Sequence, residues 1–384
     1  MPTRAGSLAV AAVACLAGAS FAHAEDTSAA PGAAPPGAGA PAQPAGQPAQ
    51  QAPPGPQRPA LDGSLSLVGL ARHVLPSVLM VEVSAPGRPR ETRHAVVVDA
   101  DGWLVMAGPT LGPSDQVLVR LGPGEHMQAA PVGSDAGTGL TLLQLAARRE
   151  GLRPLALPAV QPRRPLPAGP EVGASVVMVT GAGAVARGSL RALERQRVIV
   201  DAAHGTTERA TGLLEAALAS VAHDVGSPWV DSQGRCVALL VGGVAETPLD
   251  GESPPEGIEV RMEPVAAHGV PAAVVALVWP LLREHRGVPR SRLGVRSRPA
   301  GEALRQHVCG GCGGVEITAV DASGPADLAG VRVDDLLLAL DGVPLRAGAA
   351  LGDALLPYRP LDTVRLTVLR RGERLEVEAL LARR

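Results

Sequence analysis

Short apolar runs separated by turn-forming residues are the feature of this 384-residue chain that most constrains its fold. With three Trp, one Tyr and one Phe, its cores have to be built mainly from Val, Leu and Ala. Short runs of such residues, bounded by Gly, Pro or Asp, are typical of strands joined by tight turns. The expected strands are residues 78–83, 95–98, 104–105, 116–121, 140–145, 174–180, 198–202 and 236–241.

Helices are predicted only at the two ends of this strand-rich region. Leu67, Leu70, Ala71 and Val74 recur at helical spacing, so a short helix is expected there, ending at Pro76. A second helix is expected over residues 265–284, where it would close the domain. Because no long helix lies among the strands, the sequence predicts an antiparallel barrel or sandwich.

The N-terminal region has the pattern of a secretory leader followed by a linker. Arg4, an apolar run over residues 8–19 and the small-x-small sequence ending at Ala24 predict a cleaved signal peptide over residues 1–24. A membrane anchor is disfavoured because the run is too short to cross about 30 Å. A lipoprotein site at Cys15 is disfavoured because its flanking sequence lacks the usual Leu. Residues 25–63 are rich in Pro, Ala, Gly and Gln and predict a disordered linker.

Charge and cysteine content limit the compartment and the partners. Lys+Arg and Asp+Glu are nearly balanced at 35 and 37, so neither nucleic acid nor an anionic membrane is an expected partner. No other segment is long enough to be an integral membrane span. The signal peptide predicts a periplasmic or secreted, oxidising location. The three remaining cysteines, Cys236, Cys309 and Cys312, leave a local disulfide, free thiols, metal binding and redox chemistry open, although no metal site and no cofactor is predicted.

Three segments carry a resemblance to a known family. They are residues 102–109 (GWLVMAGP), 133–140 (GSDAGTGL) and 224–230 (DVGSPWV). Their order, spacing and flanks resemble the segments that bear the catalytic His, Asp and Ser of the trypsin-like HtrA/Deg serine proteases. The resemblance implies a trypsin-like double β-barrel, with a protease-like domain over residues 64–288.

The same alignment places no catalytic side chain at the three triad positions. The His position falls on Pro109, the Asp position on Gly139 and the Ser position on Val225. A serine nucleophile needs an adjacent base and an orienting carboxylate, so the sequence predicts a pseudoprotease, a degenerate family member without serine-protease catalysis. The alternative is an active serine endopeptidase with a displaced site, for which Ser227, two residues after Val225, is the candidate nucleophile beside His223 and Asp224.

The last ninety or so residues resemble a second module. Residues 292–295 (RLGV), 315–320 (VEITAV), 323–331 (SGPADLAGV) and 334–342 (DDLLLALDG) are similar to a bacterial PDZ domain of the kind that follows HtrA protease domains. The resemblance implies a small α+β, partly open β-barrel over residues 289–384.

A PDZ domain implies a peptide-binding groove. The loop formed by Arg292, Leu293, Gly294 and Val295 is expected to hold a C-terminal carboxylate through its backbone amides, while the ligand adds as an extra strand. Leu351 and Leu355, one helical turn apart, are expected in the opposing wall. The alternative for these apolar residues is that they fill the domain core.

The sequence therefore predicts a secreted HtrA-like pseudoprotease that binds peptide C-termini or extended segments of unfolded extracytoplasmic proteins. A scaffold, chaperone-like or regulatory role in protein quality control would follow, and a homo-oligomer is possible. A non-catalytic subunit that assembles with an active protease is the other alternative.

Overall fold

The computed structural model describes residues 66–84, 90–108, 111, 114–167, 169–201, 206–218, 224–243, 265–301, 313–346 and 350–383. The predicted signal peptide and linker lie outside these residues, as do Pro109, His223, Cys309 and Cys312.

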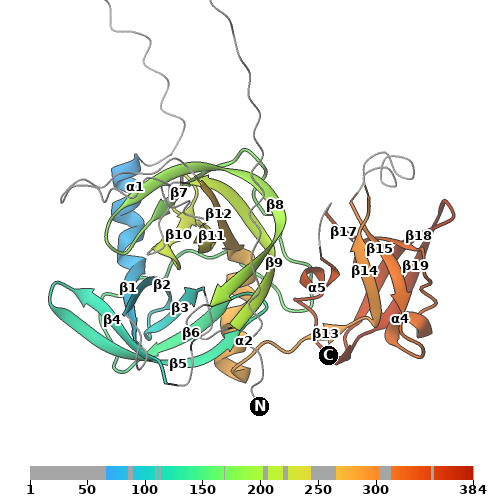
Figure 1. The fold of residues 1–384 in the computed structure, drawn as a ribbon, viewed down its shortest axis with the longest axis horizontal. Coiled ribbons are helices and arrows are strands. Elements are labelled where there is room, and N and C mark those ends of the chain that lie inside the picture. The colour runs from blue at the N-terminus through green and yellow to red at the C-terminus, as the bar shows by residue number, and fades with distance from the viewer. Residues whose placement is uncertain are drawn as a thin grey trace, which may run out of the picture. The chain divides into compact units, whose positions relative to one another are not determined.

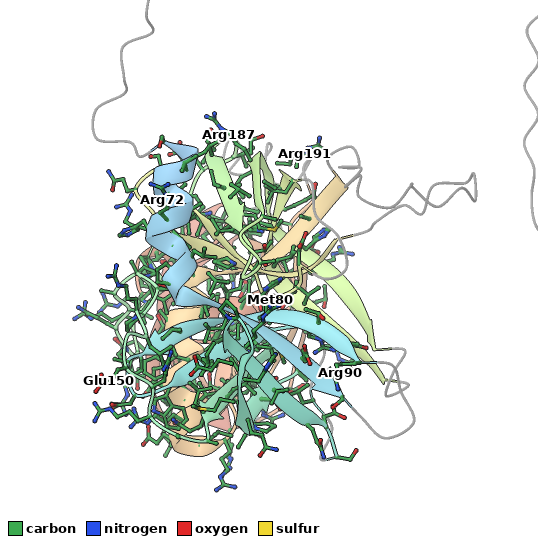
Figure 2. The ribbon with its side chains drawn as sticks, turned by 90° about the vertical axis from the view of Figure 1, so that its left-hand side faces the viewer. Arg72, Met80, Arg90, Glu150, Arg187 and Arg191 are labelled. Atoms are coloured by element: carbon green, nitrogen blue, oxygen red, sulfur yellow. The ribbon has the colours of Figure 1, made fainter. Side chains whose placement is uncertain are left out.

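The described part of the chain opens with the predicted short helix, α1 (Leu67–Val74), followed by the 3-10 turn η1 (Leu75–Ser77). The Ser66 hydroxyl caps the helix by accepting from the Gly69 amide at 3.1 Å. Leu70 and Val74 are buried, whereas Arg72 projects from the outer side of the helix (Figure 2). Leu67, which the spacing also places on that side, is 45% exposed, so only the C-terminal part of the apolar side packs inward.

The first barrel closes in the strand order β1-β2-β3-β6-β5-β4 (Figure 1). Its strands are β1 (Val78–Ser84), β2 (Glu91–Asp99), β3 (Trp103–Ala107), β4 (Gln116–Gly122), β5 (Glu125–Asp135) and β6 (Leu140–Leu145). Side chains alternate along β2: Ala95 and Val97 face the barrel interior, while Val96 and Val98 join the cluster outside it. Both faces of this strand are buried, which explains its nearly continuous apolar sequence.

The second barrel closes in the order β10-β11-β12-β9-β8-β7. Its strands are β7 (Ser175–Val179), β8 (Val185–Asp201), β9 (Thr206–Leu218), β10 (Pro228–Val230), β11 (Cys236–Gly243) and β12 (Val265–Pro271). Trp229 fills the interior and is fully buried. Arg187 and Arg191 of β8 lie on the outside of the molecule (Figure 2).

A shared core joins the two barrels to the helix α2 (Ala272–His285). Val105 and Leu142 from the first barrel and Leu239 from the second belong to this cluster, with Val275 and Leu282 from the helix. Together with the closed barrels, this core makes the trypsin-like double-barrel architecture.

The prediction of one helix over residues 265–284 is wrong for its first seven residues. These form β12, which pairs with β9 and β11, and α2 begins only at Ala272. A Cβ built on Gly269 would lie 3.1 Å from the Trp229 ring, so the strand lies close against the tryptophan. The run of small residues carries no period that separates strand from helix, and barrel closure decides the outcome.

The C-terminal region forms a separate sheet with strand order β14-β15-β16-β18-β19, with β17 paired to β16. Its elements are β13 (Ser291–Arg292), β14 (Val295–Pro299), β15 (Val315–Val320), α4 (Pro325–Leu328), β16 (Leu336–Leu340), β17 (Val343–Pro344), α5 (Leu351–Ala354), β18 (Thr363–Arg370), β19 (Glu373–Leu380) and β20 (Ala382–Arg383). β13 pairs with β20, so the start and the end of the module are tied together. The sheet and its short helices match the small α+β module expected there.

An ion pair between Asp335 and Arg370 lies within this C-terminal module. Asp335 is 1% exposed, and its carboxylate accepts from Arg370 Nε and Nη2, both at 2.7 Å. The Arg332 amide donates to the same carboxylate at 2.7 Å. The pairing with Asp335 raises the pKa of Arg370. Removing Arg370 would leave the buried Asp335 carboxylate without its ion-pair partner, whereas removing Asp335 would leave Arg370 partly exposed and still bonded to the Gly330 carbonyl.

No helix in the described ranges is long and apolar enough to cross a membrane. Cys236 is a buried free thiol, and burial raises its pKa. A buried, protonated thiol is a poor nucleophile and a poor metal ligand.

Candidate functional site

The three segments that resemble the protease triad meet in space. The Gly108 amide, at the end of the first segment, donates to the Gly139 carbonyl in the second at 2.8 Å. A Cβ built on Gly108 would lie 2.8 Å from Cγ1 of Val225 in the third. Two of the three predicted triad positions, Gly139 and Val225, are thus in contact with Gly108, the residue before Pro109. The alignment made from sequence is therefore consistent with the geometry.

The turn before Gly139 offers no carboxylate at the triad position. Asp135 lies four residues earlier, and its carboxylate accepts from the Thr138 amide at 3.0 Å and from the Thr138 hydroxyl at 2.7 Å. The Gly139 amide donates to the Asp135 carbonyl at 2.8 Å. Asp135 therefore shapes the turn, and Gly139 contributes only main-chain atoms.

The turn that carries Val225 is fixed by main-chain hydrogen bonds to both barrels. The Val225 carbonyl accepts from the His94 amide on β2 at 2.7 Å, and the Gly226 amide donates to the Leu240 carbonyl on β11 at 2.7 Å. Gly226 has φ +91°, and a Cβ there would lie only 1.8 Å from the His94 carbonyl oxygen. Only glycine fits at 226. The loop keeps its position although its central side chain is an isopropyl group.

Ser227, the candidate displaced nucleophile, is fully buried. Its Oγ has no hydrogen-bond partner within the described part of the chain. His94 is also buried, at 3% exposure, and its Nδ1 accepts from the Gly181 amide at 3.1 Å. A serine nucleophile has to reach the substrate and to transfer its proton to a base. A hydroxyl enclosed in this way does neither.

A buried arginine that the sequence reading missed borders the same place. Arg93 on β2 is 6% exposed, and its Nη2 lies 2.8 Å from a Glu91 carboxylate oxygen. Its Nη1 lies 3.9 Å from the Cβ position of Gly108. A guanidinium is always charged, so it would lower the pKa of any imidazole placed next to it. The signal in the sequence is a single basic residue at the start of an apolar strand.

The loop that was expected to bind a carboxylate has both of its central carbonyls occupied. The Leu293 carbonyl accepts from the Ala326 amide, and the Gly294 carbonyl accepts from the Asp321 amide, each at 2.9 Å. In a trans peptide the C=O and the following N–H point in opposite directions. The amides of Gly294 and Val295 therefore point away from Ala326 and Asp321. Two such amides side by side can hold a carboxylate.

Gly294 is required for this loop geometry. Its φ is +77°, and a Cβ there would lie 3.2 Å from the Pro325 ring. Leu293 is 2% exposed, while Arg292 is largely exposed and lies 3.8 Å from the Asp321 carboxylate. The loop is thus anchored by a buried leucine and carries a cation on its outer side.

Leu351 and Leu355 lie on or directly after α5 and are 7% and 5% exposed. Both belong to the same core cluster as Leu293, and Val295 packs against that cluster while staying partly exposed. The structure therefore brings together the apolar residues predicted for the groove. It places the three leucines in the core of the module.

Comparison with known proteins agrees with this geometry. A PDZ-domain family model matches residues 291–381. Serine endoprotease DegS of Escherichia coli strain K12 is 25% identical over 299 residues, covering 75% of this chain and 76% of DegS. A probable periplasmic serine endoprotease, DegP-like, of Halomonas elongata is 26% identical over 75% of this chain and 56% of its own length.

Solved structures show the same fold. The HtrA-type protease AlgW with tripeptide is 20% identical, covers 83% of this chain and 98% of its own, and superposes with a TM-score of 0.57. A serine endoprotease from Yersinia pestis covers 83% of this chain with a TM-score of 0.50. In sequence and in fold, this chain is therefore similar to HtrA-type serine proteases.

The positions matched by sequence do not hold the residue types that serine-protease catalysis needs. A family protease needs an imidazole, a carboxylate and a hydroxyl that meet at one point. By sequence, Pro109, Gly139 and Val225 fall on these positions, and the structure brings Gly139 and Val225 into contact with Gly108. The double-barrel fold is present, whereas the three residues matched by sequence carry no imidazole, carboxylate or hydroxyl.

Proposed function

We propose that this HtrA-family protein is a pseudoprotease that binds the C-termini of other proteins through its PDZ domain. The observation that carries the binding role is the loop at Gly294, where two consecutive amides point away from the bonded carbonyls of Leu293 and Gly294. The observation that supports the loss of catalysis is Val225, whose isopropyl group fills the nucleophile position against Gly108.

The ligand in this proposal is an extended segment with a free, apolar C-terminal residue. Its carboxylate is held by the amides of Gly294 and Val295, and its backbone pairs with β14 as an added strand. Val295 contacts the terminal side chain, while Leu293, Leu351 and Leu355 form the floor beneath it. Arg292 adds positive charge near the carboxylate.

The location that we propose is extracytoplasmic. The N-terminal sequence has the pattern of a cleaved signal peptide, and the Halomonas relative is named as periplasmic. Unfolded or incompletely assembled extracytoplasmic proteins would then be the partners, in a scaffolding, chaperone-like or regulatory role.

Two assays on the purified full chain test the proposal. In the first, fluorescein-casein is incubated with the wild-type chain and with Ser227→Ala, and neither is expected to cleave it above background. Cleavage that copurifies with the wild-type chain and disappears in Ser227→Ala would establish the displaced-site endopeptidase instead.

In the second assay, fluorescence polarisation compares a labelled decapeptide ending in a free apolar residue with its C-terminally amidated form. We expect binding on the order of micromolar for the free acid, because one small domain supplies the contacts. Amidation should remove most of the binding, and so should Gly294→Val, because a side chain at 294 meets Pro325. Equal binding of free and amidated peptides would refute the carboxylate site.

A non-catalytic subunit of an active protease is the second candidate. A degenerate triad on a retained scaffold fits that role equally well. Co-purification of the tagged chain with an active HtrA relative would favour it over a stand-alone binder.

A further inference from the structure

The edge of the PDZ-domain sheet carries a basic residue that the proposed carboxylate site does not use. β14 is the terminal strand in the sheet order, and β15 is its one neighbour among the described strands. Its other edge is where a peptide strand would add, so this inference rests on the proposed function. The side chains of β14 then decide which ligand sequences fit.

The side chains of β14 alternate between two faces. Val295 and Ser297 are half-buried, and Val295 packs on the core, whereas Arg296 and Arg298 are exposed. The irregularity in the pairing with β15 falls opposite the Arg296–Ser297 step, where β15 carries the extra residue, Thr318. The alternation along β14 itself is therefore intact.

The two arginines differ in their partners. Arg298 makes a two-pronged ion pair with Glu316 directly across on β15, with Nε at 2.9 Å and Nη2 at 2.8 Å from the carboxylate oxygens. Hydrogen bonding within this pair raises the pKa of Arg298 and lowers the pKa of Glu316. Arg296 has no ion pair with any residue that the structure describes. The edge strand thus presents one neutralised and one unneutralised cation.

A bound peptide would place alternate side chains on the same two faces. Residues that lie opposite each other on paired strands share a face, with Cβ atoms about 4.5–5.5 Å apart. If the terminal residue shares the face of Val295, the residue before it shares the face of Arg296. We propose that Arg296 selects ligands with an acidic penultimate residue, that is, proteins ending in Asp or Glu followed by an apolar residue.

The expected size of the effect is modest because Arg296 is exposed. Opposite charges across strands and exposed ion pairs change affinity by about two- to fivefold. A peptide with Glu at the penultimate position should therefore bind about two- to fivefold more tightly than one with Gln. A Lys peptide should bind more weakly than the Gln peptide. These differences should shrink in high salt, because exposed charges are screened.

The test measures three decapeptides, identical except for Glu, Gln or Lys before a free apolar C-terminal residue, against the full chain by fluorescence polarisation. In Arg296→Gln the Glu and Gln peptides should bind equally, and in Arg296→Glu the order of the Glu and Lys peptides should reverse. The reversal also shows that the variant is folded. Arg374→Gln, at an exposed site on β19 at the other end of the sheet, is the matched control and should keep the wild-type order.

The outcomes separate this inference from the proposed function. If no free-acid peptide binds better than its amide, the carboxylate site itself is refuted, and the selection by Arg296 with it. If free-acid peptides bind but Glu, Gln and Lys are equivalent, only the role of Arg296 is overturned. The role of Arg296 is also overturned if Arg374→Gln removes the preference for the Glu peptide as fully as Arg296→Gln does. A general effect of the protein's charge would then explain the preference.

Discussion

The contact between Gly108 and Val225 gives a quantitative test of the pseudo-triad geometry. In Gly108→Ala, the new Cβ meets two penalties. The backbone has φ +125°, a conformation that side chains rarely adopt, at a cost of about 1–3 kcal/mol. The Cβ would also lie 2.8 Å from Val225 Cγ1, and such overpacking costs about 1–3 kcal/mol. The single variant should therefore lose about 2–6 kcal/mol of unfolding free energy.

The second variant, Val225→Ala, separates these two penalties. Alone it should cost about 1–2 kcal/mol, because it removes two methyl groups from a half-buried site. In the double variant the clashing Cγ1 is absent, so the overpacking penalty disappears and the backbone penalty stays. The double-mutant cycle should therefore give a coupling energy of about 1–3 kcal/mol in favour of the double variant.

Tryptophan fluorescence during urea unfolding measures this cycle in the right domain. The chain has three tryptophans, Trp103, Trp229 and Trp279, which lie on β3, β10 and α2. The emission therefore reports on the double barrel and not on the PDZ domain. Gly173→Ala is the control, since Gly173 has φ +90° and nothing within 4 Å of its Cβ position. It should show a backbone penalty of about 1–2 kcal/mol and no coupling to Val225.

Two results would refute the reasoning. One is a Gly108→Ala variant as stable as the wild type. The other is a Gly108→Ala variant whose loss is unchanged when Val225 is shortened. Either would mean that the first and third triad segments do not meet, and the assignment of Val225 to the nucleophile position would fail with them.

Three further predictions follow from other sites. Ser227→Ala should leave the urea midpoint unchanged or raise it, because it removes a buried hydroxyl without a described partner, and a loss above about 1 kcal/mol would contradict this. Arg370→Ala should destabilise the PDZ domain by about 3–5 kcal/mol, because it leaves the buried Asp335 carboxylate without its ion-pair partner, and this should be seen as faster hydrogen exchange over β16. Arg365→Ala, whose pair is exposed, should cost under about 1 kcal/mol. Glu316 has a lowered pKa, so the stability that its ion pair with Arg298 contributes is fully present above the ordinary carboxyl pKa and is lost only as the pH falls below that range. The penultimate Glu of the peptide has the ordinary pKa of about 4.3. The preference for the Glu peptide over the Gln peptide should therefore fade near pH ~4.3, while the pair between Glu316 and Arg298 remains.

Much of the double barrel was predictable because its strands are short, apolar and bounded by turns. The segments at 78–83, 116–121 and 140–145 became β1, β4 and β6 with nearly the predicted bounds. β5 and β9 were not predicted because their sequences are polar or mixed. Their strand conformation is stabilised by pairing with neighbouring strands, β4 for β5 and β8 for β9. β12 was assigned to a helix for the reason given above, since its small residues have no distinguishing period.

The segment motifs predicted which turns come together, and the structure brings Gly139 and Val225 into contact with Gly108. The assignment of these residues to triad positions stays a prediction, and the surroundings of the site were not predicted. Arg93 was missed because a lone arginine in a strand gives no sign of where its guanidinium lies. The burial of Ser227 could not be predicted either, because a serine in a turn with polar neighbours is expected to be exposed. It is buried only in the folded domain.

The turns of the candidate site are held together by main-chain hydrogen bonds. The amide of His94 binds the Val225 carbonyl, the amide of Gly108 binds the Gly139 carbonyl, and the amide of Gly226 binds the Leu240 carbonyl. All six groups belong to the main chain, so replacing the three catalytic side chains removes none of these bonds. The proposed peptide site also depends on main-chain groups, the loop amides and the edge of β14. In the proposed pseudoprotease, loss of the triad would therefore leave the peptide-binding groups in place, provided that the glycines which allow these close approaches are kept.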